Sequence, residues 1–168
     1  LTDPLGNVTS FVYNGQGYLT TVQGPVAGAT YTFTYDSFGR LASATDPSGY
    51  VVGYSYDAAD RLTAVHYPDG TSVTLAYHLL DLASMTDRLG RGTQLTRDSE
   101  REITQITDPL SHVMQLSYCP CGLVSSVTDP NGNITTLTRD QGGRVSQKTY
   151  ADGSTVNFSY DFGSDRVS

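Results

Sequence analysis

The chain has 168 residues and a mass of 18.1 kDa, and 17 acidic against 10 basic side chains give it a net charge of −7. This size allows one ordinary domain, and the acidic balance argues against a nucleic-acid partner, since no surplus of Lys and Arg is available to neutralise phosphates. Thr, Ser, Gly, Tyr and Val dominate while Lys and Glu are almost absent. This composition predicts an all-β protein, and we expect no transmembrane segment.

Two columns of residues recur about every 21 positions from the N-terminus onward. The turn column contains Gly6, Gly28, Gly49, Gly70, Gly90, Gly132 and Gly153, with Ser111 in the remaining slot. The tyrosine column contains Tyr13, Tyr35, Tyr56, Tyr77, Arg97, Tyr118, Arg139 and Tyr160. The two columns stay in step, which predicts a single array of about eight units over residues 1–168. We expect this array to be a piece of a longer chain.

Each unit is predicted to be a β-hairpin that leads directly into the next hairpin. Segments such as 31–35 (YTFTY) and 73–77 (VTLAY) alternate between apolar and polar residues, as strands with one apolar face do. Between strands lie turns such as 46–49 (DPSG), where Asp caps the turn amides, Pro fixes φ and Gly accepts a positive φ. Successive hairpins are expected to form one continuous, spiralling antiparallel sheet.

Two segments fit this scheme less simply. Leu62 and Val65 are three residues apart, so either a bulge places both on one face or the strand is covered on both sides. Residues 77–85 (YHLLDLASM) match a short helix by pattern, but they occupy the hairpin position of their unit. We therefore predict a hairpin there.

Stacked hairpins bring one apolar position of every unit into a single row, which we expect to be the core. The row contains Phe11, Phe33, Tyr54, Leu75, Leu95, Leu116, Leu137 and Phe158. The outermost strands of such an array would expose unpaired amides. The predicted partners are therefore other copies of the chain or further repeats of its parent protein.

The unit resembles the YD repeat of the RHS family, in the segments 35–41 (YDSFGRL), 45–49 (TDPSG) and 54–57 (YSYD). This family includes bacterial polymorphic-toxin shells, the encapsulating components of insecticidal toxin complexes and the extracellular barrel of teneurins. Some units depart from the motif: Arg replaces Tyr at positions 97 and 139, His78 and Cys119 replace Asp, and Glu102 and Leu123 replace Arg.

The resemblance implies a long β-ribbon that spirals into a hollow shell, of which eight units could form an arc, or a fibre. It also implies an enclosed cargo polypeptide as a possible partner and a secreted, extracellular or cell-surface location. The family's shell-closing, self-cleaving region has no counterpart here, so no catalytic residue is carried over. We expect a non-enzymatic structural segment without a cofactor.

Cys119-Pro120-Cys121 is the most conspicuous local motif. Two thiols could bind a metal, form a local disulfide or pair with another chain, but metal sites require more ligands at defined spacing. The motif is therefore interpreted as a local variant of the hairpin turn, with no metal site predicted. The sequence also contains glycosylation acceptor motifs at Asn7, Asn133 and Asn157, whose use the sequence does not decide.

The tyrosine column leaves two functional hypotheses open. The rings can pack across strands and hold the ribbon together, which favours a structural role. Alternatively, an aromatic row beside a Thr- and Ser-rich face could bind glycans or a partner protein, as in a cell-surface binding module.

Overall fold

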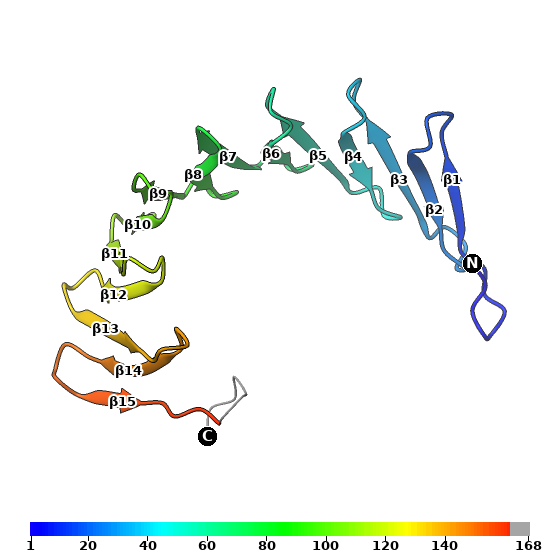
Figure 1. The fold of residues 1–168 in the computed structure, drawn as a ribbon. Helices are drawn as coiled ribbons and strands as arrows, with labels where there is room; N and C mark the ends of the chain where they lie inside the picture. The colour runs from blue at the N-terminus through cyan, green and yellow to red at the C-terminus, as the bar shows by residue number, and fades with distance from the viewer. Residues whose placement is uncertain (162–168) are drawn as a thin grey trace. The chain divides into compact units, whose positions relative to one another are not determined.

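The structure is a computed structural model that describes residues 1–161, so the last seven residues of the predicted array 1–168 lie outside the described residues. In the described part, fifteen strands follow one another in the sheet in chain order (Figure 1). The antiparallel order confirms the predicted all-β class and the hairpin repeat. The strands are β1 (Ser10–Tyr13), β2 (Leu19–Gln23), β3 (Thr30–Tyr35), β4 (Leu41–Thr45), β5 (Val51–Tyr56), β6 (Leu62–His66), β7 (Ser72–His78), β8 (Asp81–Thr86), β9 (Gly92–Arg97), β10 (Ile103–Thr107), β11 (Val113–Tyr118), β12 (Val124–Thr128), β13 (Ile134–Arg139), β14 (Val145–Thr149) and β15 (Thr155–Asn157).

The chain divides into two compact units. The first contains Leu1–Ala76 and Met85–Arg91, and the second contains Tyr77–Ser84 and the described residues from Gly92 onward. The segment 77–85 forms the end of β7, a turn and most of β8, which confirms the predicted hairpin and excludes the helix that its pattern also allowed. Within residues 1–161, no helix is long and apolar enough to cross a membrane.

Most turns share one geometry, in which an aspartate starts a five-residue loop whose fourth residue is left-handed. In the turn after β4, the amide of Asp46 donates to the carbonyl of Tyr50, and the amide of Gly49 donates back to the carbonyl of Asp46. Gly49 has φ = 85°, which glycine adopts without steric cost. The Asp46 carboxylate accepts the amides of Ser48 and Tyr50 at 2.8 and 3.0 Å. The predicted capping role of this aspartate is confirmed.

A β-bulge recurs in both units and resolves the position of Leu62. Between β5 and β6, Ser55 pairs with Ala64 but Tyr56 pairs with Leu62, so Thr63 is the extra residue. Because Tyr54 faces Val65 and side chains alternate along β5, Leu62 and Val65 lie on the same face of the sheet. The same register shift precedes the column residue of five further hairpins, at Tyr13, Tyr35, Arg97, Tyr118 and Arg139.

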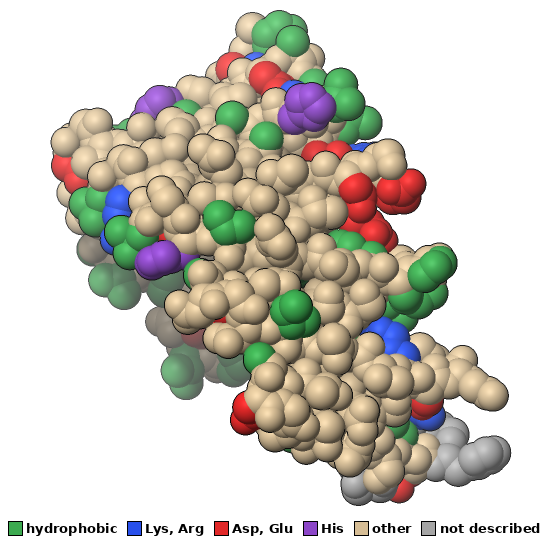
Figure 2. Space-filling model, turned by 90° about the vertical axis from the view of Figure 1, so that its left-hand side faces the viewer, with side chains coloured by type: hydrophobic (Ala, Val, Ile, Leu, Met, Phe, Trp, Pro, Cys, Tyr) green, Lys and Arg blue, Asp and Glu red, His purple; other side chains and the backbone are tan. Residues whose placement is uncertain are grey.

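The expected core is not a buried one. The predicted apolar row does lie along one face of the strands within each unit, but its members are only half-buried, and Phe11 is 44% exposed. Among the described residues only Ala64 is buried, at 9% exposure. On the face seen in Figure 2, hydrophobic side chains form separate small patches among the backbone and other side chains. The prediction of a core was wrong because a sheet buries a face only when a second layer packs against it.

Candidate functional site

Four tyrosines of the column join their hairpin to the one before it. Each of the four stands at or shortly after the end of an odd-numbered strand, and its hydroxyl donates to a backbone carbonyl 15 or 16 residues earlier. That carbonyl belongs to the first residue of the preceding even-numbered strand. We call these bonds carbonyl latches: Tyr35 to Leu19 (2.8 Å), Tyr56 to Leu41 (3.0 Å), Tyr118 to Ile103 (2.9 Å) and Tyr160 to Val145 (2.8 Å).

The side chains around the Tyr35 latch pack closely against one another. The Tyr35 ring stacks on Tyr18, with ring centroids 4.8 Å apart and planes at 23°. The Tyr18 ring in turn lies against Gly39, so closely that a β-carbon on Gly39 would overlap it. Tyr35 is half-buried, whereas Tyr13, in the first hairpin, is 59% exposed. Engagement with a preceding hairpin therefore shields the column tyrosines from solvent.

The arginine of the Gly-Arg motif connects neighbouring turns of the first unit. Arg40 pairs with Asp36 of its own turn at 2.8 Å, and its other end reaches the carbonyl of Asp57 (3.0 Å) and the carboxylate of Asp60 (2.8 Å) in the next hairpin. Its guanidinium also lies 4.9 Å from the ring centroids of Phe38 and Tyr56. Arg40 therefore forms ion pairs with Asp36 and Asp60. It also stacks on Tyr56, the latch tyrosine of the following hairpin.

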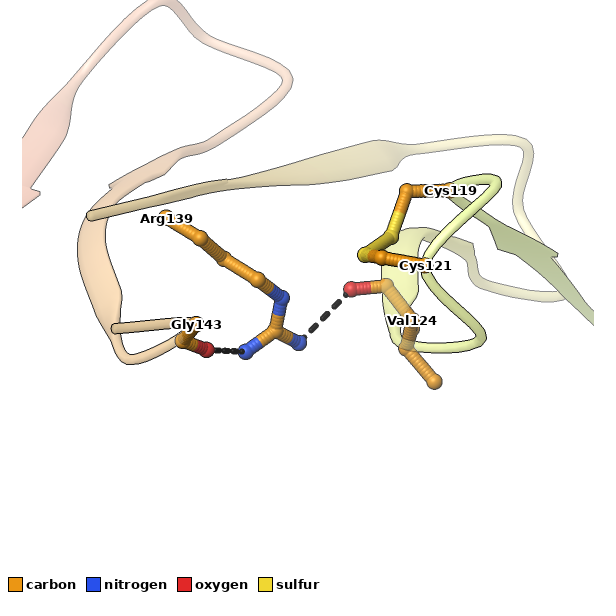
Figure 3. The surroundings of a disulfide bond; sticks show 5 residues. All are labelled: Cys119, Cys121, Val124, Arg139 and Gly143. Atoms are coloured by element: carbon orange, nitrogen blue, oxygen red, sulfur yellow. Dashed lines mark hydrogen bonds between the residues drawn. A yellow bond between two sulfur atoms is a disulfide. The ribbon is translucent and has the colours of Figure 1, made fainter. Parts of the chain in front are cut away.

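Arginine occupies the tyrosine column at positions 97 and 139, and Arg139 makes the same latch. Its guanidinium donates to the carbonyl of Val124 at 2.8 Å and to that of Gly143 at 3.0 Å (Figure 3). Arg97 makes the second of these contacts, to the carbonyl of Arg101 at 2.8 Å. The Nε atoms of both arginines are buried without a hydrogen-bond partner in the described residues. Arginine thus replaces tyrosine in the column but leaves a polar atom unsatisfied.

The turn carboxylates are held in the charged form by their own turns. The pKa of Asp57 is lowered from its ordinary value of 3.8. The hydrogen bond from the Arg61 guanidinium has the largest lowering effect, and the bond from the Arg61 backbone amide comes next. Where the turn lacks arginine, an amide does the same: the side chain of Asn133 lowers the pKa of Asp129, with its backbone amide adding to the effect. The carboxylates of Asp57 and Asp129 are each used within their own loop, and no group of three or more possible metal ligands occurs in residues 1–161.

The family follows from comparison with known proteins. A family model described as RHS Repeat matches residues 19–50, 35–72 and 122–161, which together cover more than half of the sequence. The chain belongs to the RHS repeat family. No curated protein matches the chain.

Solved structures of the same fold are much longer than this RHS chain. A crystal structure of TcdB2-TccC3 without its hypervariable C-terminal region matches with a TM-score of 0.66, and structures of TcdB2-TccC3 and of TcdB2-TccC3-Cdc42 match with 0.65. Each match covers 96% of this chain at 14% identity. Since it covers only 11% of the other chain, this RHS chain spans about a tenth of those proteins. At this identity the likeness shows the fold alone.

One turn of the RHS array contains a disulfide in place of an aspartate. Cys119 and Cys121 are joined, with their Cα atoms 5.1 Å apart, within the loop that follows β11 (Figure 3). Of the three possibilities that the sequence left open for these thiols, the structure has the local disulfide. The loop keeps the backbone pattern of the other turns, since the amide of Cys119 donates to the carbonyl of Leu123 at 2.9 Å.

The predicted glycine column and two of the acceptor asparagines lie in turns of the RHS units. All seven glycines of the column have φ between 78° and 85°, and Ser111, which fills the remaining slot, has φ = 67°. The side-chain amides of Asn7 and Asn133 each donate to the aspartate that opens their turn, at 2.8 Å. Asn157 lies in the exposed strand β15, where its side chain accepts a bond from Gln147.

Sequence reasoning placed the column residues but missed their acceptors. A pattern of side chains does not reveal which backbone carbonyl a hydroxyl will reach, because that depends on strand pairing and the bulge. The constant spacing of about 15 residues between each column residue and the apolar start of the preceding strand was the available signal. Arg97 and Arg139 were treated as departures from the motif, whereas Arg139 preserves the contact.

Proposed function

We propose that this chain is a non-enzymatic structural segment, part of the wall of an RHS-type β-shell or of an extracellular fibre of the same ribbon. The observation that carries the proposal is the carbonyl latch, which recurs from hairpin to hairpin in both units. A contact of this kind ties the tyrosine side chain of one hairpin to the backbone of the hairpin before it, so the tyrosine hydroxyls serve the assembly of the sheet. Such repetition supports a mechanical role.

The lack of a buried core in residues 1–161 supports the same proposal. A single layer whose apolar residues stay half-exposed gains little from burial by itself, since removal of apolar surface from water is the main stabilising contribution. Strands β1 and β15 each have one neighbour in the described sheet. We propose that further RHS repeats, from the parent chain or from other copies, pair with these edges.

We also propose a cargo and a location for this RHS segment. The similar solved structures are of TcdB2-TccC3 complexes, one of which also contains Cdc42. By analogy with the shells of the RHS family, we propose that the wall encloses a polypeptide cargo. A secreted, extracellular or cell-surface location is supported by the Cys119–Cys121 disulfide, because disulfides persist in oxidising compartments.

The alternative, a surface module that binds glycans or a partner protein, has weaker support. The hydroxyls of Tyr35, Tyr56, Tyr118 and Tyr160 already donate to backbone carbonyls, so they are not free to donate to a sugar. A glycan array discriminates between the two functions. Specific binding that is lost when a single column tyrosine is changed to alanine would favour the binding module.

Edge pairing gives the sharpest test of the wall. We expect sedimentation velocity to show concentration-dependent assembly, and electron microscopy to show curved sheets, shells or fibres. Val12→Lys places a charge on edge strand β1 and is expected to reduce assembly, whereas Val26→Lys, at a 70% exposed loop position, makes the same charge change away from it. A strict monomer at high concentration would contradict edge pairing between copies of the chain, and reproducible turnover of polysaccharide or peptide substrates would contradict the non-enzymatic role.

A further inference from the structure

The turn between β11 and β12 is closed by a bond of a different kind from that of the next turn along the chain, between β12 and β13. In the turn Asp129-Pro130-Asn131-Gly132, a carboxylate oxygen of Asp129 accepts the amides of Asn131 and Asn133, both at 2.9 Å. In Cys119-Pro120-Cys121-Gly122 the first side chain has no oxygen, and a disulfide joins the first and third residues instead. These are the same two positions that the aspartate joins by a hydrogen bond.

The backbone of the two turns is otherwise alike. The amide of Gly122 donates to the carbonyl of Cys119 at 3.0 Å, as that of Gly132 donates to the carbonyl of Asp129. The φ angles of the two glycines are 73° and 85°. The disulfide therefore replaces the carboxylate cap and leaves the loop conformation unchanged.

The geometry points to a reversible redox-modification site: the Cys119–Cys121 disulfide is a covalent turn cap, and its reduction selectively loosens the β11–β12 turn. Reduction leaves two thiols, which are weak hydrogen-bond acceptors, in place of the covalent link. No carboxylate stands in the first position of this turn to take over. The inference does not depend on the proposed wall function.

The site is open to a small reductant. Cys121 is exposed, and Cys119 is half-buried and lines a surface hollow of about 660 Å³ that also includes Asp98, Glu100 and Glu102. A thiolate of a small dithiol attacks one cysteine sulfur, forms a mixed disulfide and releases the other cysteine as a thiolate that takes up a proton. The second thiol of the reagent then displaces the first cysteine. The dithiol is oxidised to a cyclic disulfide, and the cysteine pair gains two electrons and two protons.

Loosening this turn also affects the adjacent latch. Tyr118 precedes Cys119 directly, and its hydroxyl donates to the carbonyl of Ile103 at 2.9 Å. A mobile loop holds the end of β11 less firmly, so this contact is expected to open more often. The effect remains local because the other turns are capped by hydrogen bonds that a dithiol leaves intact.

Hydrogen–deuterium exchange on the full chain, with and without dithiothreitol, tests the inference. We expect reduction to speed amide exchange at residues 119–123 by about tenfold or more, as local opening becomes easier. Residues 129–133 are the internal control and should not change. The double variant Cys119→Asp with Cys121→Asn reproduces the Asp129 turn and should exchange slowly whether or not dithiothreitol is present.

A second double variant, Cys119→Ser with Cys121→Ser, mimics the reduced state and should exchange rapidly without reductant. It keeps the test decisive if the Asp–Asn variant fails to fold. The inference is overturned if reduction leaves exchange at 119–123 unchanged, or if residues 129–133 respond equally. It is also overturned if mass spectrometry of the untreated protein finds two free thiols, a bound metal or a disulfide between chains.

Discussion

Removing one latch hydroxyl measures how much the tyrosine column stabilises the sheet. Tyr35→Phe deletes the hydroxyl group that donates to the carbonyl of Leu19 at 2.8 Å and keeps the ring that stacks on Tyr18. A neutral hydrogen bond contributes about 0.5–1.5 kcal/mol to the free energy of unfolding. Tyr35 is half-buried, so water replaces only part of the lost bond. We expect a loss of about 1 kcal/mol, which lowers the melting temperature by roughly 2–4 °C in a chain of this size.

Tyr13→Phe is the matched control, because Tyr13 lies in the first hairpin and is 59% exposed. Its loss of stability should stay below about 0.5 kcal/mol, as for an ordinary surface substitution. Urea unfolding gives both free energies, and hydrogen–deuterium exchange places the effect of Tyr35→Phe in β2 and β3. Equal losses in the two variants, or no loss at Tyr35, would show that the latch does not hold the hairpins together.

Three further predictions concern the turns and the column. Gly39→Ala should lower the melting temperature far more than Gly49→Ala. Both positions require a positive φ, but only a β-carbon at Gly39 overlaps the Tyr18 ring. Similar losses in the two variants would show that backbone strain alone sets the loss of stability. Arg139→Tyr should raise stability by up to about 1 kcal/mol, since tyrosine can keep the bond to Val124 and removes the unsatisfied Nε, and a large loss would contradict this. The folded state lowers the pKa of turn aspartates such as Asp57 below 3.8. The stability that these aspartates contribute is therefore fully present above about pH 3.8 and should be lost as the pH falls through their lower folded pKa. Thermal melts that do not change between pH 6 and pH 2 would contradict this prediction.

Burial raises the pKa of Glu102, and the nearby carboxylates of Asp98 and Glu100 raise it further, so this group acts in the opposite direction. Its charged form is unfavourable in the folded state, and protonation relieves that cost as the pH falls through its folded pKa. Glu102→Gln should therefore remove the gain in stability that appears as the pH falls toward 4.5, the ordinary pKa of a glutamate, without altering the loss at lower pH.

Local chemistry explains why the turns could be predicted. An aspartate that accepts the next amides and a glycine with positive φ act within five residues, as at 46–50, so neither needs information from elsewhere in the chain. The disulfide is different: the pattern at 119–122 indicated a turn variant, but the oxidation state of two cysteines is not written in their spacing.

By itself the sequence determined the period of about 21 residues, the alternation along each strand and the places of the turns, since each of these arises from contacts between near neighbours in the chain. Only the tertiary structure decided the position of Leu62, the carbonyls that the latch residues reach and the lack of a buried core in residues 1–161. A bulge is defined by the pairing of two strands, and burial of a sheet face requires a second layer. The sequence of a single strand therefore reveals neither.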